Sequence, residues 1–320
     1  MIISTLAAMT AGYVLGLVLG VPRVISARRL LGLLCEWLAP TIKSRYQDSE
    51  EGKHTAGIVY LVLLLLMLLV PILAVLILLY IFFPFGAIVI DAVLCWSVMD
   101  IKGISTAAGI AARAVKVGNQ PKAARYATLI SGEDCSELEV DDSARGAVQG
   151  IADRTVDTIV GPLLCSFILS GAGAVMFAAA DAAAGVADSR YGESDSFGDT
   201  ARGMRDVLCF LPGKLAAVIM LVDALFLKLN TRNAERIMKS DSKKCARTAF
   251  GSCRAVLAGL LGISLLPEEV YSEQFMRTFT IGEQLKDPSE SDIFTSRQLM
   301  LGTSFIVMLL LFMIKLAIGI

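Results

Sequence analysis

The sequence predicts an all-α, polytopic membrane protein with a polar helical insert and interfacial loops. Of its 320 residues, 55% are hydrophobic and only 18% are charged, and the mean hydropathy is +0.67. Several of its apolar stretches approach or exceed the roughly 20 residues that a membrane helix needs. The net charge of -1 provides no basic field, which excludes nucleic acid as a partner.

The first elements are apolar stretches separated by a basic segment. Residues 3–20 are uncharged and are predicted to form a membrane helix, because a signal peptide would begin with positive residues. The positive-inside rule places the Lys- and Arg-rich segment 21–57 in the cytoplasm. Residues 58–83 give the strongest membrane signal, and we expect Pro71 to kink this helix without ending it.

A polar insert, residues 102–157, follows a predicted turn at 84–86 and a short apolar stretch. Helical spacing of its alanines predicts a first helix that ends at Gly118. Pro121 opens a second helix ending near Gly132. A third helix begins around Asp141 and Asp142, which are expected to act as N-caps.

The second half of the chain alternates between apolar and polar segments. The apolar stretch 159–187 contains Gly171-Ala172-Gly173, and it is either one tilted span or a broken pair of helices. Composition and charge predict the remaining segments: polar loop 188–206, apolar helix 207–227, basic cytoplasmic segment 228–254, apolar run 255–266, polar loop 267–298 and a final span over 299–318. We expect residues 1–320 to form a single membrane domain in the cell membrane, with its polar site on the cytoplasmic side.

Neither cysteine nor histidine chemistry is indicated. The seven cysteines are odd in number and contain no Cys-x-x-Cys pair, so they are interpreted as reduced packing residues. The single histidine, His54, has no second ligand at metal-binding spacing and is expected to be solvated. One histidine also gives no support for a Ser-His-Asp triad, and no Walker loop is present.

Two groups of acidic residues are candidates for chemistry. Four-residue spacing places Arg145, Gln149, Asp153 and Asp157 on one helical stripe, with Arg154 beside it. The stripe is either a solvated face with salt bridges or a functional site, because Asp157 stands at the mouth of an apolar segment.

The second group, Asp181 and Asp188, also lies on one helical face. It is either a Mg²⁺ site or a pair of interfacial acids bound to arginine. Asp91, alone in an apolar stretch, is either a functional residue or a buried one satisfied by backbone groups.

Three motifs in chain order resemble the CobD/CbiB family. Residues 152–157, followed by Gly161-Pro162, are similar to the family's Ala-Glu-Asn-Thr-Val-Asp run before a Pro-led apolar helix. The turn 132–134 is similar to its Gly-Arg-Asp turn. Residues 198–212, which include Arg202 and Asp206, are similar to its Met-Asp-Asp and Leu-Pro stretch. Weaker similarities to the family occur at residues 259–265, 281–282 and 292–293.

The resemblance implies an enzyme that joins adenosylcobyric acid to aminopropanol or its phosphate through an ATP-dependent amide bond. It implies ATP and Mg²⁺ as cofactors, with a corrinoid, an aminopropanol-type amine, membrane lipid and other membrane enzymes of the pathway as partners. The implied catalytic residues are Asp134, Asp153 and Asp157, with the last two as Mg²⁺ ligands. The implied substrate- or phosphate-binding residues are Arg154, Asp181, Arg202 and Asp206. Asp153 and Asp157 are expected to share a polar site with Asp134 or Asp181.

Several positions depart from the family pattern. The family's Glu and Asn of the central run are Asp153 and Arg154 here, and its later His and Glu fall at Cys245 and Arg254. Its Lys, Asn and Asp of the next motif fall at Ala178, Asp181 and Ala184. Two other functions therefore stay open: a non-catalytic membrane scaffold or sensor of the same fold, or a transporter that uses Asp91 and the interrupted 159–187 segment.

Overall fold

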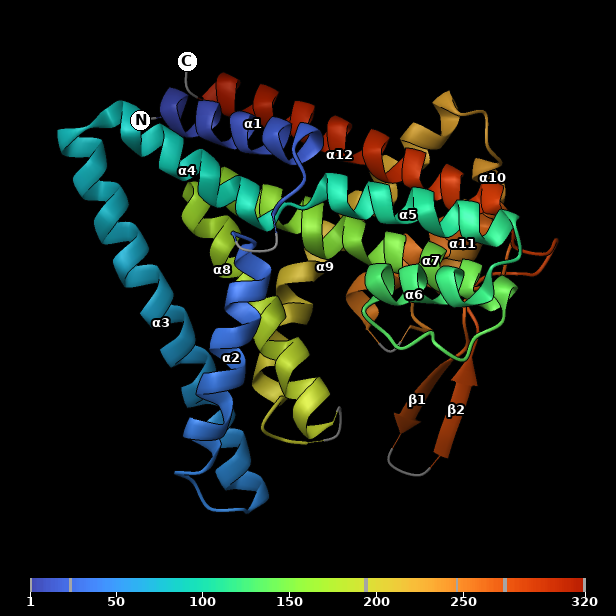
Figure 1. The fold of residues 1–320 in the computed structure, drawn as a ribbon, viewed down its shortest axis with the longest axis horizontal. Coiled ribbons are helices and arrows are strands. Elements are labelled where there is room, and N and C mark those ends of the chain that lie inside the picture. The colour runs from blue at the N-terminus through green and yellow to red at the C-terminus, as the bar shows by residue number, and fades with distance from the viewer. Residues whose placement is uncertain (1, 23–24, 193–194, 246, 273–274, 319–320) are drawn as a thin grey trace. The chain divides into compact units, whose positions relative to one another are not determined.

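The computed structural model describes residues 2–22, 25–192, 195–245, 247–272 and 275–318, and apart from a two-stranded hairpin the regular elements of these residues are helices (Figure 1). The chain divides into two compact units. The first unit contains residues 1–100, 161–208 and 310–320, and the second contains residues 101–160 and 209–309. The assignment of residues 1–320 to a single domain stays a prediction.

The first unit is built from apolar helices. They are α1 (Ile2–Val18), α2 (Ala27–Lys43), α3 (Glu50–Phe82), α4 (Pro84–Val98) and α8 (Gly161–Tyr191), with the start of α9 (Asp199–Phe226) and the end of α12 (Glu290–Ile318). Within the unit, α1 packs on α4, and α2 and α3 both pack on α8.

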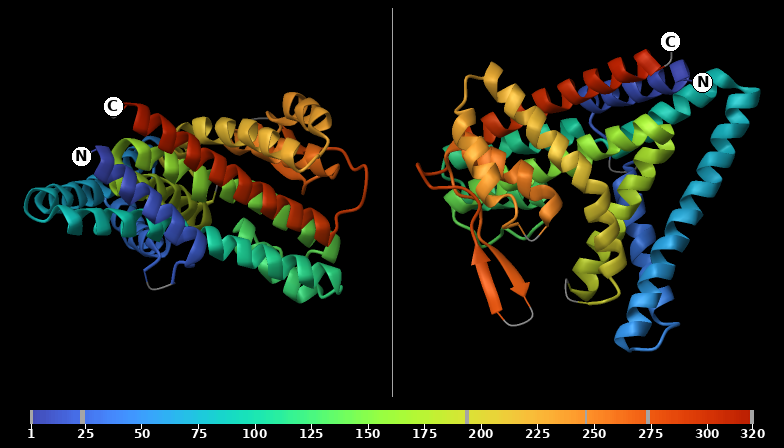
Figure 2. Two further views of the ribbon diagram at one scale, coloured as in Figure 1. Left: turned by 90° about the horizontal axis from the view of Figure 1, so that it is seen from above. Right: turned by 180° about the vertical axis from the view of Figure 1, so that it is seen from behind.

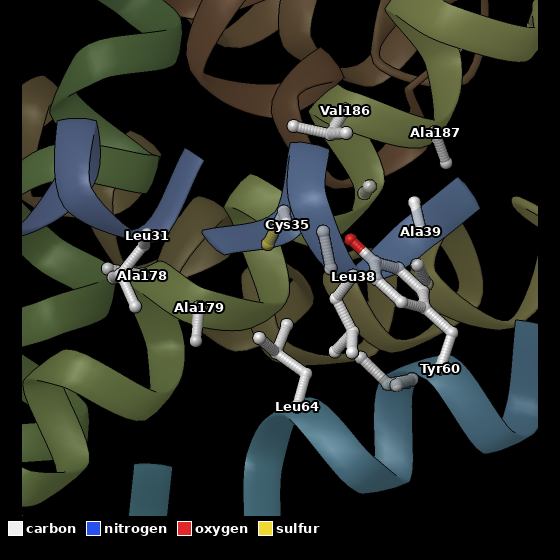
Figure 3. Close-up of a cluster of buried hydrophobic side chains, with 14 of the residues drawn as sticks. Leu31, Cys35, Leu38, Ala39, Tyr60, Leu64, Ala178, Ala179, Val186 and Ala187 are labelled. Carbon is white, nitrogen blue, oxygen red and sulfur yellow. The ribbon is translucent and has the colours of Figure 1, made fainter. Parts of the chain in front are cut away.

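The core of the first unit combines large side chains from α2 and α3 with alanines from α8. Figure 3 shows Leu31 and Cys35 of α2, Leu64 of α3, and Ala178 and Ala179 of α8 in this cluster. The small alanine side chains let the helices approach closely, as small residues do between membrane helices.

One proline lies inside α3, and another begins α4. Pro71 lies inside α3, which continues through it as expected, and Figure 2 shows α3 as one continuous helix. The predicted turn at 84–86 is wrong: only Phe83 separates the helices, and Pro84 is the first residue of α4. Proline suits that position because the first N–H of a helix has no intrahelical acceptor.

The interrupted apolar stretch is a broken helix. Leu169 and Ser170 within α8 have non-helical backbone angles, and Ser170 has a φ of 54°. The break comes directly before Gly171 and decides between the two alternatives for residues 159–187.

The second unit contains the predicted insert. Its elements are α5 (Ile101–Lys116), α6 (Gln120–Ser131), α7 (Val140–Arg154), the π-helix η1 (Thr155–Val160), α10 (Thr231–Asp241), α11 (Thr248–Leu261), β1 (Glu268–Ser272) and β2 (Phe275–Phe279), with the remainder of α9 and α12. Helix α7 packs on α5, α6 and α11. The sequence predicted only a loop for residues 267–298, where β1 and β2 pair antiparallel.

The helix ends of the insert are close to those expected. Gly132 follows α6 in the left-handed conformation, with a φ of 81°. Asp141 and Asp142 lie in the first turn of α7 and do not cap it, because the helix already begins at Val140. Acidic residues in a first turn still complement the helix dipole.

Five stretches of the described chain are long and apolar enough to cross a membrane. They are Glu50–Phe82, Pro84–Lys116, Val140–Tyr191, Asp199–Phe226 and Glu290–Ile318. Two of them join successive helices, α4 with α5 and α7 with η1 and α8. These stretches indicate a multi-pass membrane protein.

Candidate functional site

The candidate site begins where α7 changes into a π-helix. Pro162 has no N–H to offer the carbonyl of Thr158, so a regular α-helical ladder cannot continue there. The backbone widens over Thr155–Val160, all six residues of which are buried. Single π-helical turns inside longer helices are frequent at functional sites.

Asp153, in the last turn of α7, is bound to a buried arginine of α11. Arg254 donates from Nε to Oδ1 over 2.6 Å and from Nη2 to Oδ2 over 2.5 Å. The Arg254 and Asp153 side chains are only 1% and 8% exposed. Two parallel charge-assisted bonds fix the carboxylate in orientation as well as in charge.

Asp157 lies in the π-helix and is held by two neighbours. Arg154 donates from Nη1 to Oδ2 over 3.2 Å, and Thr158 donates to Oδ1 over 2.5 Å. Arg154 also donates from Nε to the carbonyl of Ile130 at the end of α6, over 2.9 Å. The arginine therefore connects the π-helix to α6.

The turn after α6 lies beside this arginine. A Cβ on Gly132 would stand 3.1 Å from Nη2 of Arg154, so glycine at this position leaves room for the guanidinium. Asp134, two residues on, is exposed and accepts a bond from the backbone N–H of Ser136 over 3.0 Å. That bond holds the pKa of Asp134 below its usual value.

The predicted polar stripe does not extend from α7 into the π-helix. Asp157 no longer continues the α-helical spacing of Arg145, Gln149 and Asp153, because the wider turn contains more residues. Arg145 instead contacts Ser264, with Nη1 2.5 Å from its hydroxyl oxygen.

The residues implied to bind Mg²⁺ do not fit that ion in this arrangement. Both oxygens of Asp153 are bound to Arg254, and those of Asp157 to Arg154 and Thr158. A hard cation needs several oxygen ligands. No group of three or more acidic, cysteine or histidine side chains suited to a metal occurs in the described part of the chain. The Mg²⁺ role of Asp153 and Asp157 stays a prediction.

The other predicted site residues belong to the first unit. Asp181 of α8 accepts a bond from Arg28 of α2 over 2.9 Å. Arg202 of α9 contacts Asp188 over 2.8 Å and Asp199 over 2.7 Å. Asp206 lies about one turn after Arg202 in the same helix and is half-buried. Asp181 and Asp188 thus form the arginine pairs that were one of their two expected arrangements.

Asp91 of α4 is bound at the break of α8. Its carboxylate accepts a bond from the backbone N–H of Gly171 over 2.7 Å and another from the Ser170 hydroxyl. Lys315 of α12 donates to the carbonyl of Phe167, just before the break, over 3.1 Å. These contacts satisfy both ends of the interrupted helix, which accounts for a buried carboxylate here without a substrate.

Sequence reasoning missed the part played by Arg254. We assigned it to the end of a basic segment, whereas it lies inside the buried apolar helix α11. The signal was present, since a single arginine with apolar residues after it needs an anionic partner once buried.

The fold and this site define a class: a helical multi-pass membrane protein with a buried ionic centre at a π-helix. The family model described as CobD/Cbib protein matches residues 9–300. The chain belongs to this family, which is named for cobalamin biosynthesis.

Curated relatives carry names from the same pathway. The chain is 29% identical over 231 residues to "Cobalamin biosynthesis protein CobD" of Geobacter metallireducens, covering 71% of each chain. It is 25% identical over 231 residues to the protein of that name from Clostridium perfringens, covering 71% of this chain and 72% of the relative. It is 24% identical over 222 residues to "Cobalamin biosynthesis protein CbiB" of Salmonella arizonae, covering 69% of each. No solved structure matches the chain.

Proposed function

We propose that this protein joins the carboxyl group of a corrinoid, adenosylcobyric acid, to an aminopropanol-type amine as an amide, at the cytoplasmic face of the cell membrane. The observation that carries the proposal is the family match over residues 9–300. The buried ionic centre at the π-helix, where that family's central motif falls, supports it. Such a centre is costly to bury and is not explained by stability alone.

Amide formation expels an oxygen from the carboxyl group, so that oxygen must first become a better leaving group. ATP is the activating reagent that the family implies. On this proposal the side chains of the second unit supply fixed charge. Arg154, whose side chain is 25% exposed, is placed to counter negative charge on a substrate. Asp153 acts as a positioning residue that orients Arg254, and no step is assigned to Mg²⁺.

The ion pairs also favour a second candidate, a non-catalytic scaffold or sensor of the same family. Arg254 occupies a position at which the resemblance implies an acid, and it neutralises Asp153. A site whose acids are all bound internally has fewer groups left for proton transfer.

Complementation of a strain that lacks the aminopropanol-attaching enzyme separates the two candidates. Growth dependent on the wild-type chain, and lost in Asp157→Asn at equal membrane expression, supports the ligase. Failure to complement, together with binding of adenosylcobyric acid by the purified chain in detergent, supports the scaffold or sensor. Absence of both growth and corrinoid binding contradicts both.

A further inference from the structure

The first unit contains a basic pocket where α2 ends and α3 begins. Its volume is about 420 Å³, within the range of small-ligand sites. Its walls come from the last turn of α2, the loop 44–48, the first turn of α3 and the end of α8. Three of the side chains that line it are cations, Lys43, Lys53 and Arg190, and one is an acid, Asp48. The lining therefore carries an excess of positive charge.

The three cations differ in how far neighbouring acids compensate their charge. The Lys43 ammonium binds Asp195 over 2.9 Å, and Lys53 is paired with two exposed acids over 3.3 and 3.5 Å. Arg190 is exposed and donates to the backbone carbonyl of Glu36 over 3.4 Å, and the described part of the chain gives it no acidic partner. A guanidinium has five N–H donors in a planar fork that matches a phosphate, so Arg190 keeps most of its donors for a ligand.

An exposed apolar stripe of α2 leads into the pocket. Leu30, Leu33 and Trp37 are 53%, 53% and 60% exposed. Pro40 and Ser44, which line the pocket, follow Trp37 at the same helical spacing. The stripe therefore connects a surface suited to acyl chains with a cluster of phosphate donors. A soluble anion makes no use of such a surface, whereas a phospholipid uses both parts.

The position of Lys53 along α3 places the pocket at the depth of lipid headgroups. Lys53 lies about 7.5 Å of helix before Ile58, where the apolar run 58–83 begins. The headgroup layer on each side of a bilayer is about 5–7 Å thick. Trp37 and Tyr46 are exposed aromatic residues of the kind enriched in this layer. The segment 21–57 is predicted to be cytoplasmic, and basic segments beside a membrane helix on that side attract anionic lipids.

We propose that this pocket binds the headgroup of an anionic phospholipid, with its phosphodiester on Arg190 and Lys53 and its acyl chains along Leu33 and Trp37. The bound lipid connects α2, α3 and α8, because residues of all three helices line the pocket. Lipid binding at this pocket is independent of the proposed amide formation, so its test needs no measurement of activity.

Titration of the purified full chain in detergent with lipids of identical acyl chains tests the proposal. The probes are dioleoylphosphatidylglycerol, dioleoylphosphatidylcholine and the soluble glycerol 3-phosphate, and native mass spectrometry measures their occupancy. We expect phosphatidylglycerol to bind at least about tenfold more tightly than either other probe, since it alone combines net negative charge with acyl chains. Arg190→Gln and Lys53→Gln should each weaken its binding about fivefold, the contribution of one cation near a membrane surface.

Arg45→Gln is the matched control, since Arg45 is an exposed cation of the same loop that does not line the pocket. It should bind phosphatidylglycerol like the wild type. Without lipid, Arg190→Gln should unfold at the wild-type temperature, because it loses only the bond to a carbonyl. Equal binding of the two lipids overturns the proposal, and so does equal weakening by Arg190→Gln and Arg45→Gln, which diffuse attraction would produce. Glycerol 3-phosphate binding as tightly as phosphatidylglycerol marks a site for soluble phosphate and also overturns it.

Discussion

Aspartates pair with arginines in both units, but at different depths. In the first unit, Arg202 stands between Asp188 and Asp199 with its side chain 16% exposed. In the second unit, Arg254 is 1% exposed and bound to Asp153. Water and salt reach the first group at Asp199, whose side chain is 52% exposed. The second pair is removed from water, so the geometry of its two hydrogen bonds must offset the cost of desolvating both charges.

This difference in burial distinguishes ion pairs that anchor a segment from an ion pair that belongs to the candidate site. The pairs of the first unit hold the segment between α8 and α9, where Lys43 of α2 also binds Asp195 over 2.9 Å. A buried pair is poor evidence for stability, because apolar residues of similar size often stabilise as well or better. The burial of the Asp153–Arg254 pair in the second unit is therefore better explained by function than by stability.

Breaking the buried pair should have the largest effect. Arg254→Ala leaves the Asp153 carboxylate buried without its cation, which is expected to cost about 3–5 kcal/mol. The measurement is thermal or denaturant unfolding of the purified chain in detergent, with membrane yield as a second readout.

The apolar double variant Asp153→Leu with Arg254→Met is the control. It removes both charges together, so its stability should return close to that of the wild type while complementation stays lost. A single variant as stable as the wild type would show that the pair is not buried as described. Growth supported by the double variant would remove the pair from the site.

The contact between α6 and α7 should be the next most sensitive feature. A Cβ on Gly150 would lie 2.6 Å from the backbone of Ser131, so Gly150→Ala forces the helices apart. Overpacking of this kind costs about 1–3 kcal/mol. The expected result is a lower unfolding temperature and weaker complementation, because α7 carries Asp153.

Gly185→Ala, in α8 of the first unit, is the matched substitution. Nothing lies within 4 Å of the added Cβ, and alanine favours the helix. We expect it to be neutral or slightly stabilising, by at most about 1 kcal/mol. Equal destabilisation by the two variants would contradict the close approach at Gly150.

Removing the partly exposed arginine of the first unit should cost less than removing Arg254. Arg202→Ala breaks its pairs with Asp188 and Asp199, but Arg205 still contacts Asp188 over 3.3 Å. A loss of about 1–2 kcal/mol is expected for charged hydrogen bonds of this exposure. A double-mutant cycle with Asp188→Ala measures the coupling, which should be smaller than that between Asp153 and Arg254.

The smallest effect should be a loss of folding stability at acid pH. Burial alone would raise the pKa of Asp195, but the Lys43 ammonium and the N–H of Phe197 bring it below the ordinary 3.8. The carboxylate's contribution is therefore fully present above pH 3.8, and it is lost as the pH falls through the lowered pKa.

Unfolding temperatures measured across this acidic range test the contribution. The wild type should lose more stability on acidification than Asp195→Asn, which cannot titrate. The same slope in both proteins would show that the Lys43 pair adds nothing to the anchoring of this segment.

The sequence was enough for much of the fold. Apolar runs such as 58–83 predicted membrane helices, because a bilayer admits only segments that satisfy their own backbone. Gly132 and Pro121 indicated the limits of α6, because each fixes a local backbone geometry. The hairpin of β1 and β2 was not predicted, because the pairing of these strands does not appear as a hydrophobic period in the polar segment.

Local chemistry in the sequence thus determined the membrane class, the succession of apolar and polar segments and the motif that carries Asp153 and Asp157. Only the tertiary structure decided what those acids contact. Asp153 and Arg254 are separated by 101 residues, and their bond depends on α7 packing against α11. At the interruption of α8, the backbone N–H of Gly171 likewise binds Asp91 of another helix. Spacing along a chain specifies which side chains share a face, whereas long-range packing determines which charges meet and therefore what they can do.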